Sequence, residues 1–280
     1  MPRTSPGRTL TALALVGATA VAAVVGARWV ADELSPPGCV FAAADREVSL
    51  TPEQAANAAT IAGVAVQRGL PPRAVTIALA TAIQESKLRN LRYGDADSQG
   101  LFQQRPSQGW GTVEQILDPV YASNAFYDAL VQVDGWQTGV VTEVAQEVQR
   151  SAFPDAYADH EWEGRVLASV LTGQEGTSTS MGCALDDLRG DGSAADLAAK
   201  AAAQLGVTGT PDATRGTLTL ELPDEATAWA VATWAVSHAA TEDVASVQVG
   251  GREWSREARS SSFSEAADPV GGTTVVVEVG

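Results

Sequence analysis

The segment Ile83-Gln84-Glu85-Ser86 is followed, ten residues after Glu85, by Asp95-Ala96-Asp97-Ser98-Gln99-Gly100-Leu101-Phe102-Gln103-Gln104. The first segment closes an apolar run over 72–88 whose aliphatic residues recur at helical spacing. Glu85 is therefore expected in the last turn of a helix that is mostly core. Small residues one turn earlier would let its carboxyl group lie against the helix surface instead of protruding from it. Partial desolvation there would favour the protonated form that a general acid needs.

The second segment is typical of a turn that runs into Gly100-Leu101-Phe102-Gln103. Glu-Ser followed by Ser-x-Gly-Leu-(Phe or Met)-Gln resembles the lysozyme superfamily, specifically the lytic transglycosylases and goose-type lysozymes. The resemblance implies that Glu85 is the catalytic acid. It also implies that the next motif is a strand at the bottom of the substrate cleft, with Phe102 in place of the family's Met. The substrate contacts implied there are made by Ser98, Gly100, Leu101, Phe102 and Gln103.

Two further family motifs are matched in part or not at all. Residues 118–127 are similar to the Asn-Ile-x-x-Gly-Ala-x-Tyr-Leu helix, which implies a substrate contact for Tyr127. The motif Ala-Tyr-Asn-Ala-Gly is missing. In the nearest stretch, 145–151, Gln149 stands in for the Asn as a substrate-binding residue. The missing motif belongs to the upper wall of the cleft, so its absence bears on how the substrate fits.

The resemblance implies cleavage of the β-1,4 MurNAc–GlcNAc bond of peptidoglycan glycan strands, with no cofactor and no metal. In a lytic transglycosylase the muramoyl 6-hydroxyl attacks and Glu85 serves first as acid and then as base. In a goose-type hydrolase a second carboxylate, Asp95 or Asp97, holds a water on the opposite face of the sugar. The alternative for both aspartates is turn chemistry, since Asp bonds its own backbone in loops. Transglycosylation is the preferred interpretation.

A different class of function also fits the pattern. A non-catalytic peptidoglycan-binding or scaffold module could keep a lysozyme-like shape, and the missing third motif supports it. Glu85 separates the two hypotheses, because a binding module needs no acid on a buried wall.

Composition limits the partners. The 280-residue chain has a net charge of −16 and a pI near 4.4. Such acidity argues against nucleic acid and against an anionic lipid surface as partners. The only two histidines, His160 and His238, are far apart in sequence, and with them the chain has too few ligands for a metal site.

The N-terminal residues indicate export. Arg3 and Arg8 precede an uncharged apolar run over 10–27. Its length lies between a membrane span and a signal-peptide core, so residues 1–30 are predicted to be a signal anchor or a signal peptide cleaved near Ala27. The positive charge before the run places the remainder outside the cell membrane, either anchored to it or secreted to the cell wall. Residues 31–48 are predicted to be a linker.

The remaining pattern predicts an α+β fold. Cys39 and Cys183 are the only cysteines, and in an exported chain they are expected to form a disulfide. Residues 49–172 are predicted to be a mainly helical, lysozyme-like catalytic domain. A linker containing Cys183 is predicted over 173–192, and a separate small α/β sandwich of unknown role over 193–280. Residues 256–267 are polar and Ser-rich, which favours a mobile segment.

Overall fold

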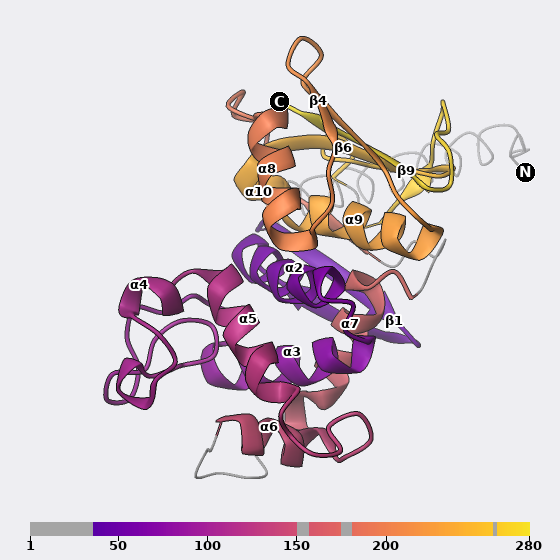
Figure 1. Ribbon diagram of the computed structural model, residues 1–280. Helices are drawn as coiled ribbons and strands as arrows, with labels where there is room; N and C mark the ends of the chain where they lie inside the picture. The colour runs from indigo at the N-terminus through magenta and orange to yellow at the C-terminus, as the bar shows by residue number, and fades with distance from the viewer. Residues whose placement is uncertain (1–35, 150–156, 175–180, 260–261) are drawn as a thin grey trace, which may run out of the picture. The chain divides into compact units, whose positions relative to one another are not determined.

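The computed structural model describes residues 36–149, 157–174, 181–259 and 262–280, and its mixture of helix and sheet confirms an α+β protein (Figure 1). The helices are α2 (Pro52–Gln67), α3 (Pro72–Ser86), η1 (Pro106–Gln108), α4 (Val113–Ile116), α5 (Pro119–Leu130), α6 (Val141–Gln149), η2 (Ala158–His160), α7 (Glu161–Leu171), α8 (Ala194–Leu205), α9 (Glu225–Ser237) and α10 (Ala239–Glu242). The strands are β1 (Gly38–Ala43), β2 (Arg46–Leu50), β3 (Met181–Ala184), β4 (Thr210–Asp212), β5 (Thr217–Glu221), β6 (Val244–Val249), β7 (Arg252–Ser255), β8 (Ser264–Glu265) and β9 (Thr274–Val279).

Local sequence signals explain where the first helices begin and how closely they pack. Thr51 and Gln54 form a capping box at the start of α2, in which each side chain bonds the other residue's backbone N–H. Proline stands in the first turn of both α2 and α3. Helix α7 crosses α3 at Gly164, where an added Cβ would lie 2.7 Å from the carbonyl oxygen of Thr76. Glycine is therefore required for this approach.

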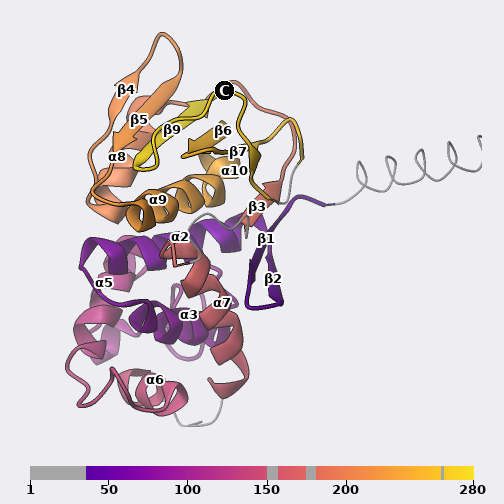
Figure 2. The same cartoon turned by 90° about the vertical axis from the view of Figure 1, so that its right-hand side faces the viewer.

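Two antiparallel sheets complete the fold (Figure 2). The smaller sheet has the order β2-β1-β3, and the larger one has the order β4-β5-β9-β6-β7-β8. In the larger sheet alternate residues such as Leu218, Leu220 and Val277 are buried, as expected when helices cover one face. Helix α8 contacts β5, and α9 contacts β6 and β9.

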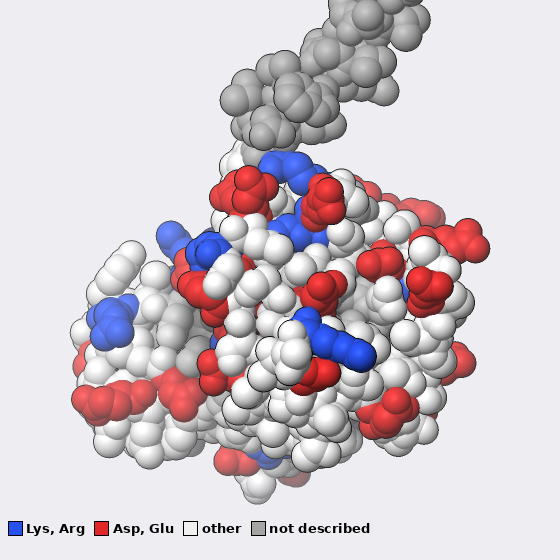
Figure 3. Space-filling view, turned by 90° about the horizontal axis from the view of Figure 1, so that it is seen from above, with Lys and Arg blue, Asp and Glu red and all other residues white. Residues whose placement is uncertain are grey.

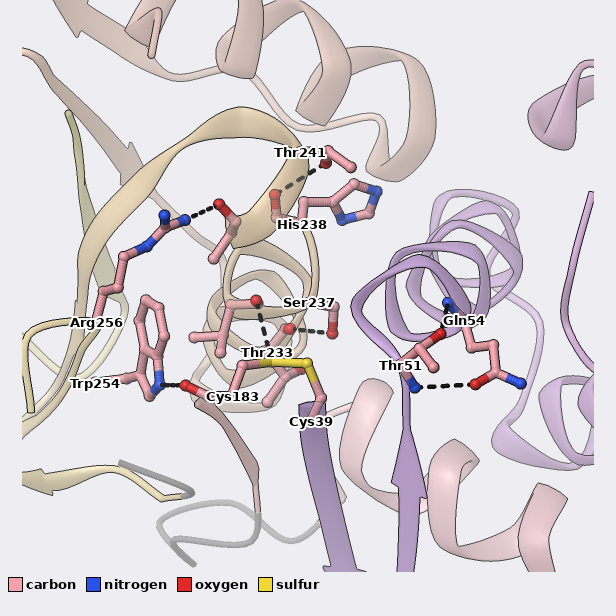
Figure 4. The surroundings of a disulfide bond; sticks show 12 residues. Cys39, Thr51, Gln54, Cys183, Thr233, Ser237, His238, Thr241, Trp254 and Arg256 are labelled. Atoms are coloured by element: carbon pink, nitrogen blue, oxygen red, sulfur yellow. Dashed lines mark hydrogen bonds between the residues drawn. A yellow bond between two sulfur atoms is a disulfide. The ribbon is translucent and has the colours of Figure 1, made fainter. Parts of the chain in front are cut away.

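The predicted disulfide is confirmed. Cys39 on β1 and Cys183 on β3 face each other in the register of the smaller sheet and are bonded (Figure 4). Both side chains are buried, and the carbonyl oxygen of Cys183 accepts a hydrogen bond of 3.2 Å from the indole of Trp254. Closing a loop with a sequence separation of 144 residues restricts the unfolded chain. On the chain-entropy model this contributes about 5 kcal/mol of stability.

Two segments predicted to be linkers are partly strand. Within the predicted 31–48 linker, residues 38–48 belong to the β1–β2 hairpin, which continues to Leu50, and Cys183 lies on β3 rather than in a linker. Because β1 buries alternate residues against α7, its strand character depends on tertiary contacts that composition does not reveal. The predicted signal segment 1–30 and part of the predicted 173–192 linker lie outside the described residues. The described helices include none with the length and apolar character needed to cross a membrane.

The segment expected to be mobile over 256–267 is anchored at its start by a buried ion pair. The guanidinium of Arg256 lies 3.2 Å from the Asp243 carboxylate, and both side chains are at most 5% exposed. Burial alone would raise the pKa of Asp243. The backbone N–H groups of Arg189 and Gly190 and the charge of Arg256 outweigh it, so the pKa is lowered. Asp243 thereby holds residues 189–191 against the larger sheet.

Helix α2 is shared between the helical half and the larger sheet with its helices. It contacts α3 and α5, and it also contacts α8, α9 and α10. Residues 37–280 form one compact unit. The predicted separate domain at 193–280 is therefore not confirmed. On the face seen in Figure 3, acidic side chains of described residues are spread among fewer basic ones.

A buried polar network joins α2, α8 and α9. The indole of Trp234 donates to the Gln204 side-chain oxygen at 2.7 Å, and the Thr60 hydroxyl lies 3.2 Å from the same oxygen. His238 is 2% exposed, with Nδ1 placed 2.9 Å from the carbonyl oxygen of Trp234 and Nε2 placed 3.4 Å from Thr60. Burial lowers the pKa of His238 to about 3.

His238 should make the folded state sensitive to acid. An unfolded histidine binds a proton below about pH 6.5, whereas folded His238 stays neutral until about pH 3. Its contribution is present above pH 6.5 and is lost as the pH falls towards 3. Because one pKa unit corresponds to about 1.4 kcal/mol, the loss should amount to a few kcal/mol.

Urea unfolding of the wild type and of His238→Gln at pH 7.0 and 4.5 measures this effect. The variant should lose less unfolding free energy between the two pH values than the wild type does. Equal losses would contradict the role assigned to His238.

Candidate active site

The position of Glu85 is set by the way α3 ends. Lys87 and Leu88 both adopt left-handed backbone conformations, and the N–H of Leu88 returns to the carbonyl oxygen of Ala82. Two side chains of α2 bind the carbonyls that leave the helix. Gln54 donates to Lys87 at 2.8 Å, and Asn57 donates to Leu88 at 2.8 Å. Helix α2 therefore fixes the turn that presents Glu85.

The half-buried Glu85 carboxylate has a specific partner. The hydroxyl of Tyr157 donates a hydrogen bond of 2.7 Å to Oε1 of Glu85. Tyr157 is 1% exposed, so its ring is fixed by packing and its hydroxyl orients the carboxylate. No motif in the sequence singles out Tyr157 as a partner of Glu85. Its hydrogen bond joins residues 72 positions apart, which spacing alone does not reveal.

The motif after Glu85 forms a tight turn, so the predicted strand over 100–103 is wrong. Isolated bridges join Leu91 to Gly100 and Gln99 to Gln104. Gly100 has φ +79°, and an added Cβ would lie 2.6 Å from the carbonyl oxygen of Ile116. No residue with a side chain fits there without a shift of the backbone.

Leu101 and Phe102 accept hydrogen bonds through their carbonyl oxygens, while their side chains pack in the core. Both side chains are fully buried, and the Phe102 ring stacks on Phe126 with centroids 4.6 Å apart. Their carbonyl oxygens accept hydrogen bonds of 2.7 Å from the Ser86 hydroxyl and from the Gln149 side-chain nitrogen, respectively. The three segments singled out in the sequence, near 85, 101 and 149, are therefore joined.

Asp95, Asp97 and Ser98 hold the neighbouring turn. Arg105 forms an ion pair of 2.6 Å with Asp95 and donates to the Ser98 hydroxyl at 2.9 Å. Asp97 accepts hydrogen bonds from both the backbone N–H and the hydroxyl of Ser107, at 2.8 and 2.9 Å. The N–H of Ser107 is the main reason why the pKa of Asp97 is lowered. Both aspartate side chains thus hold the loop together through partners ten positions along the chain, rather than through their own backbone.

Gln103 and Tyr127 differ in how well they fit the expected substrate contacts. The Gln103 carboxamide is half-buried and donates to the carbonyl oxygens of Gly100 and Tyr93, at 3.2 and 3.4 Å. Tyr127 is fully buried and donates to the carbonyl oxygen of Ile61 at 3.0 Å, and burial raises its pKa. The predicted substrate contact of Tyr127 is therefore incompatible with its place in the core.

A cavity of about 580 Å³ lies between the 108–110 turn, α5 and α6. Two aromatic side chains line it, Trp110 and Tyr121, together with the carboxamides of Gln108, Gln132 and Gln149. Aromatic faces combined with planar hydrogen-bonding groups suit a sugar, which presents apolar C–H faces and hydroxyl edges. Gln149 connects this cavity with the Phe102 carbonyl and thus with the segment next to Glu85.

Among the described residues, no group of three or more His, Cys, Asp or Glu side chains is placed to hold a metal ion. No model of a known protein family matches this chain, and no curated protein matches it either. The chemistry assigned to the site thus depends on its residues and geometry.

Asp97 provides a titration test of the turn. Because Ser107 donates to the carboxylate form, the Ser107 amide proton resonance should follow the titration of Asp97. Its midpoint should lie below about 3.9, the ordinary value for aspartate. The contribution of these bonds to stability is present above that value and is lost as the pH falls through the lowered pKa of Asp97.

Two-dimensional NMR of the amide groups measures this titration, and Asp97→Asn should abolish it. A Ser107 midpoint at or above the ordinary value would show that the two bonds do not form in solution.

Proposed function

We propose that this protein cleaves the glycan strand of peptidoglycan outside the cell membrane, as a lytic transglycosylase. The observation that carries the proposal is the Glu85 carboxylate, which is half-buried and held by the hydroxyl of the buried Tyr157. Ser86, the residue after Glu85, donates a hydrogen bond to the Leu101 carbonyl. Gln149 donates to the next carbonyl, that of Phe102, and borders the cavity whose lining suits a sugar.

In the proposed reaction Glu85 donates its proton to the glycosidic oxygen as the bond to the anomeric carbon breaks. The resulting carboxylate then accepts the proton of the muramoyl 6-hydroxyl as that oxygen bonds to the anomeric carbon. The products are a 1,6-anhydro sugar end and a free 4-hydroxyl on the neighbouring sugar. Tyr157 keeps one carboxylate oxygen fixed, which leaves the other oxygen of Glu85 for proton transfer.

The contacts of Asp95 and Asp97 favour transglycosylation over hydrolysis. An inverting hydrolase needs a carboxylate free to hold a water opposite the acid. Asp95 is paired with Arg105, and Asp97 is bonded twice to Ser107. Transglycosylation needs no such water, so it is compatible with aspartates that are already engaged.

The disulfide supports the proposed location. A buried Cys39–Cys183 bond persists in the oxidising environment outside the membrane. We place the bulk of the chain there, held by the N-terminal segment as an anchor or released after its cleavage.

Glu85→Gln should abolish wall-cleaving activity. The glutamine keeps the size of the side chain and can still accept from Tyr157, but it cannot deliver a proton. General acid catalysis contributes about 10²–10⁴-fold, so product formation should fall towards background. Mass spectrometry of peptidoglycan fragments measures the yield, and pull-down with insoluble glycan should show that binding is retained. Glu53→Gln, which changes an exposed carboxylate in the first turn of α2, is the matched control and should keep full activity.

Full activity in Glu85→Gln would refute the proposed mechanism. Asp95→Asn and Asp97→Asn distinguish the two reactions. Retained activity with 1,6-anhydro products supports the transglycosylase. If either variant loses activity and the wild-type products end in reducing sugars, the enzyme is instead a hydrolase.

Tyr157→Phe should lower the rate while the fold is kept. Removing one hydrogen bond to a charged group typically costs about 1.5–3 kcal/mol, which corresponds to about tenfold or more in rate if the bond orients the acid in the transition state. Tyr127→Phe is the matched control, because it removes a buried hydroxyl whose one hydrogen bond among the described residues is to the Ile61 carbonyl. It should lower the unfolding free energy but leave the rate per folded molecule unchanged. Equal rates for the wild type and Tyr157→Phe would show that the Tyr157 hydroxyl does not position Glu85.

A further inference from the structure

A second cavity lies at one end of the larger sheet. Its volume is about 340 Å³, and it is bounded by the first turn of α9, the β6–β7 turn and the loop at 270–272. Pockets of this size accept small ligands. The residues around it belong to the C-terminal part of the chain, for which the sequence predicted no role.

Opposite charges line this cavity without meeting. Glu225 and Arg252 both border it, yet among the described residues neither side chain takes part in an ion pair or a side-chain hydrogen bond. Arg252 is half-buried, and it lies two positions before Trp254 on β7, so it is directed to the covered face of the sheet. A guanidinium there with no partner has lost part of its hydration without compensation. An anion in the cavity would supply the missing partner.

The other walls are shaped to leave room for a ligand. Trp229 provides an apolar wall and is fixed edge-to-face against Phe263, with ring centroids 5.3 Å apart. The two-residue turn Gly250–Gly251 joins β6 to β7 and adds no side chains to the cavity. At Gly272 an added Cβ would lie 2.9 Å from Oε1 of Glu225, so any side chain there would enter the space beside the carboxylate.

We propose that this cavity binds a zwitterionic small molecule of the amino-acid or short-peptide class, with Arg252 taking its carboxylate and Glu225 its ammonium group. Arginine suits the carboxylate because its planar N–H groups can donate two parallel hydrogen bonds. The apolar face of Trp229 contacts the part of the ligand between its two charges. The site is separate from Glu85, so its existence does not depend on the proposed glycan cleavage.

Calorimetric titration of the full-length chain with three probes tests the proposal. Glycylglycine carries both charges, N-acetylglycylglycine lacks the ammonium group, and glycylglycinamide lacks the carboxylate. Glycylglycine should bind saturably with one site per chain, and each capped probe should bind at least about tenfold more weakly. This comparison uses the unaltered protein, so it does not depend on how well a variant folds.

Two variants assign the ligand's charges to residues, a third tests the space beside Glu225, and a fourth is the control. Arg252→Gln should weaken glycylglycine to the level of the amide probe, and Glu225→Gln should weaken it to the level of the acetylated probe. Gly272→Ala should weaken all three probes by filling the space beside Glu225. Arg215→Gln alters an arginine that is 81% exposed beside Asp212, and it should bind as the wild type does. The proposal is overturned if no probe binds saturably, if the capped probes match glycylglycine, or if Arg252→Gln and Glu225→Gln bind glycylglycine unchanged.

Discussion

The close packing of α2 is the constraint on which the rest of the molecule depends. Most residues of this helix are buried, and many of them are small, including Ala55, Ala58, Ala59 and Ala62. Gly63 allows the backbone at Gln204 to approach, since an added Cβ there would be 3.2 Å from its carbonyl oxygen. Larger residues would push α3 and α9 away from α2. Because Gln54 and Asn57 of the same helix bind the end of α3, such a movement would also displace Glu85.

Polar groups give this packing a single register. Alanine faces are smooth and would tolerate sliding, whereas the bonds among Thr60, Gln204, Trp234 and His238 are satisfied only when the three helices stand in one arrangement. A buried network of this kind costs free energy in any alternative arrangement that leaves its members unpaired. The Cys39–Cys183 bond also fixes the position of α9, because Cys183 Sγ lies 3.6 Å from the carbonyl oxygen of Val236 on that helix.

The sequence predicted those parts of the fold that local signals determine. The apolar periodicity of α3 is read from neighbouring residues, and the pairing of the only two cysteines follows from their count in an exported chain. The pairing of β1 with β3, its packing against α7 and the pairing of β9 between β5 and β6 depend on contacts between distant segments. Composition does not reveal such contacts, so it indicated a linker over 31–48. At the candidate site, Glu85 and Gln149 could be singled out from the sequence. The bond from Tyr157 and the core position of Tyr127 could not, because a tyrosine in an amphipathic segment suits the core and a cleft equally well.

Packing accounts for several of the motif residues near 100. Ser86 and Gln149 bind the carbonyl oxygens of Leu101 and Phe102, and any residue type supplies a carbonyl oxygen. The Leu101 and Phe102 side chains fill the core, where the Phe102 ring stacks on Phe126. Gly100 is fixed by its φ of +79° and by the nearby Ile116 carbonyl. Of the residues in these motifs, Glu85 is the one whose identity packing does not explain, because glutamine would fill the same space and accept the same bond from Tyr157. The proton transfer proposed above is the role that would require an acid at this position.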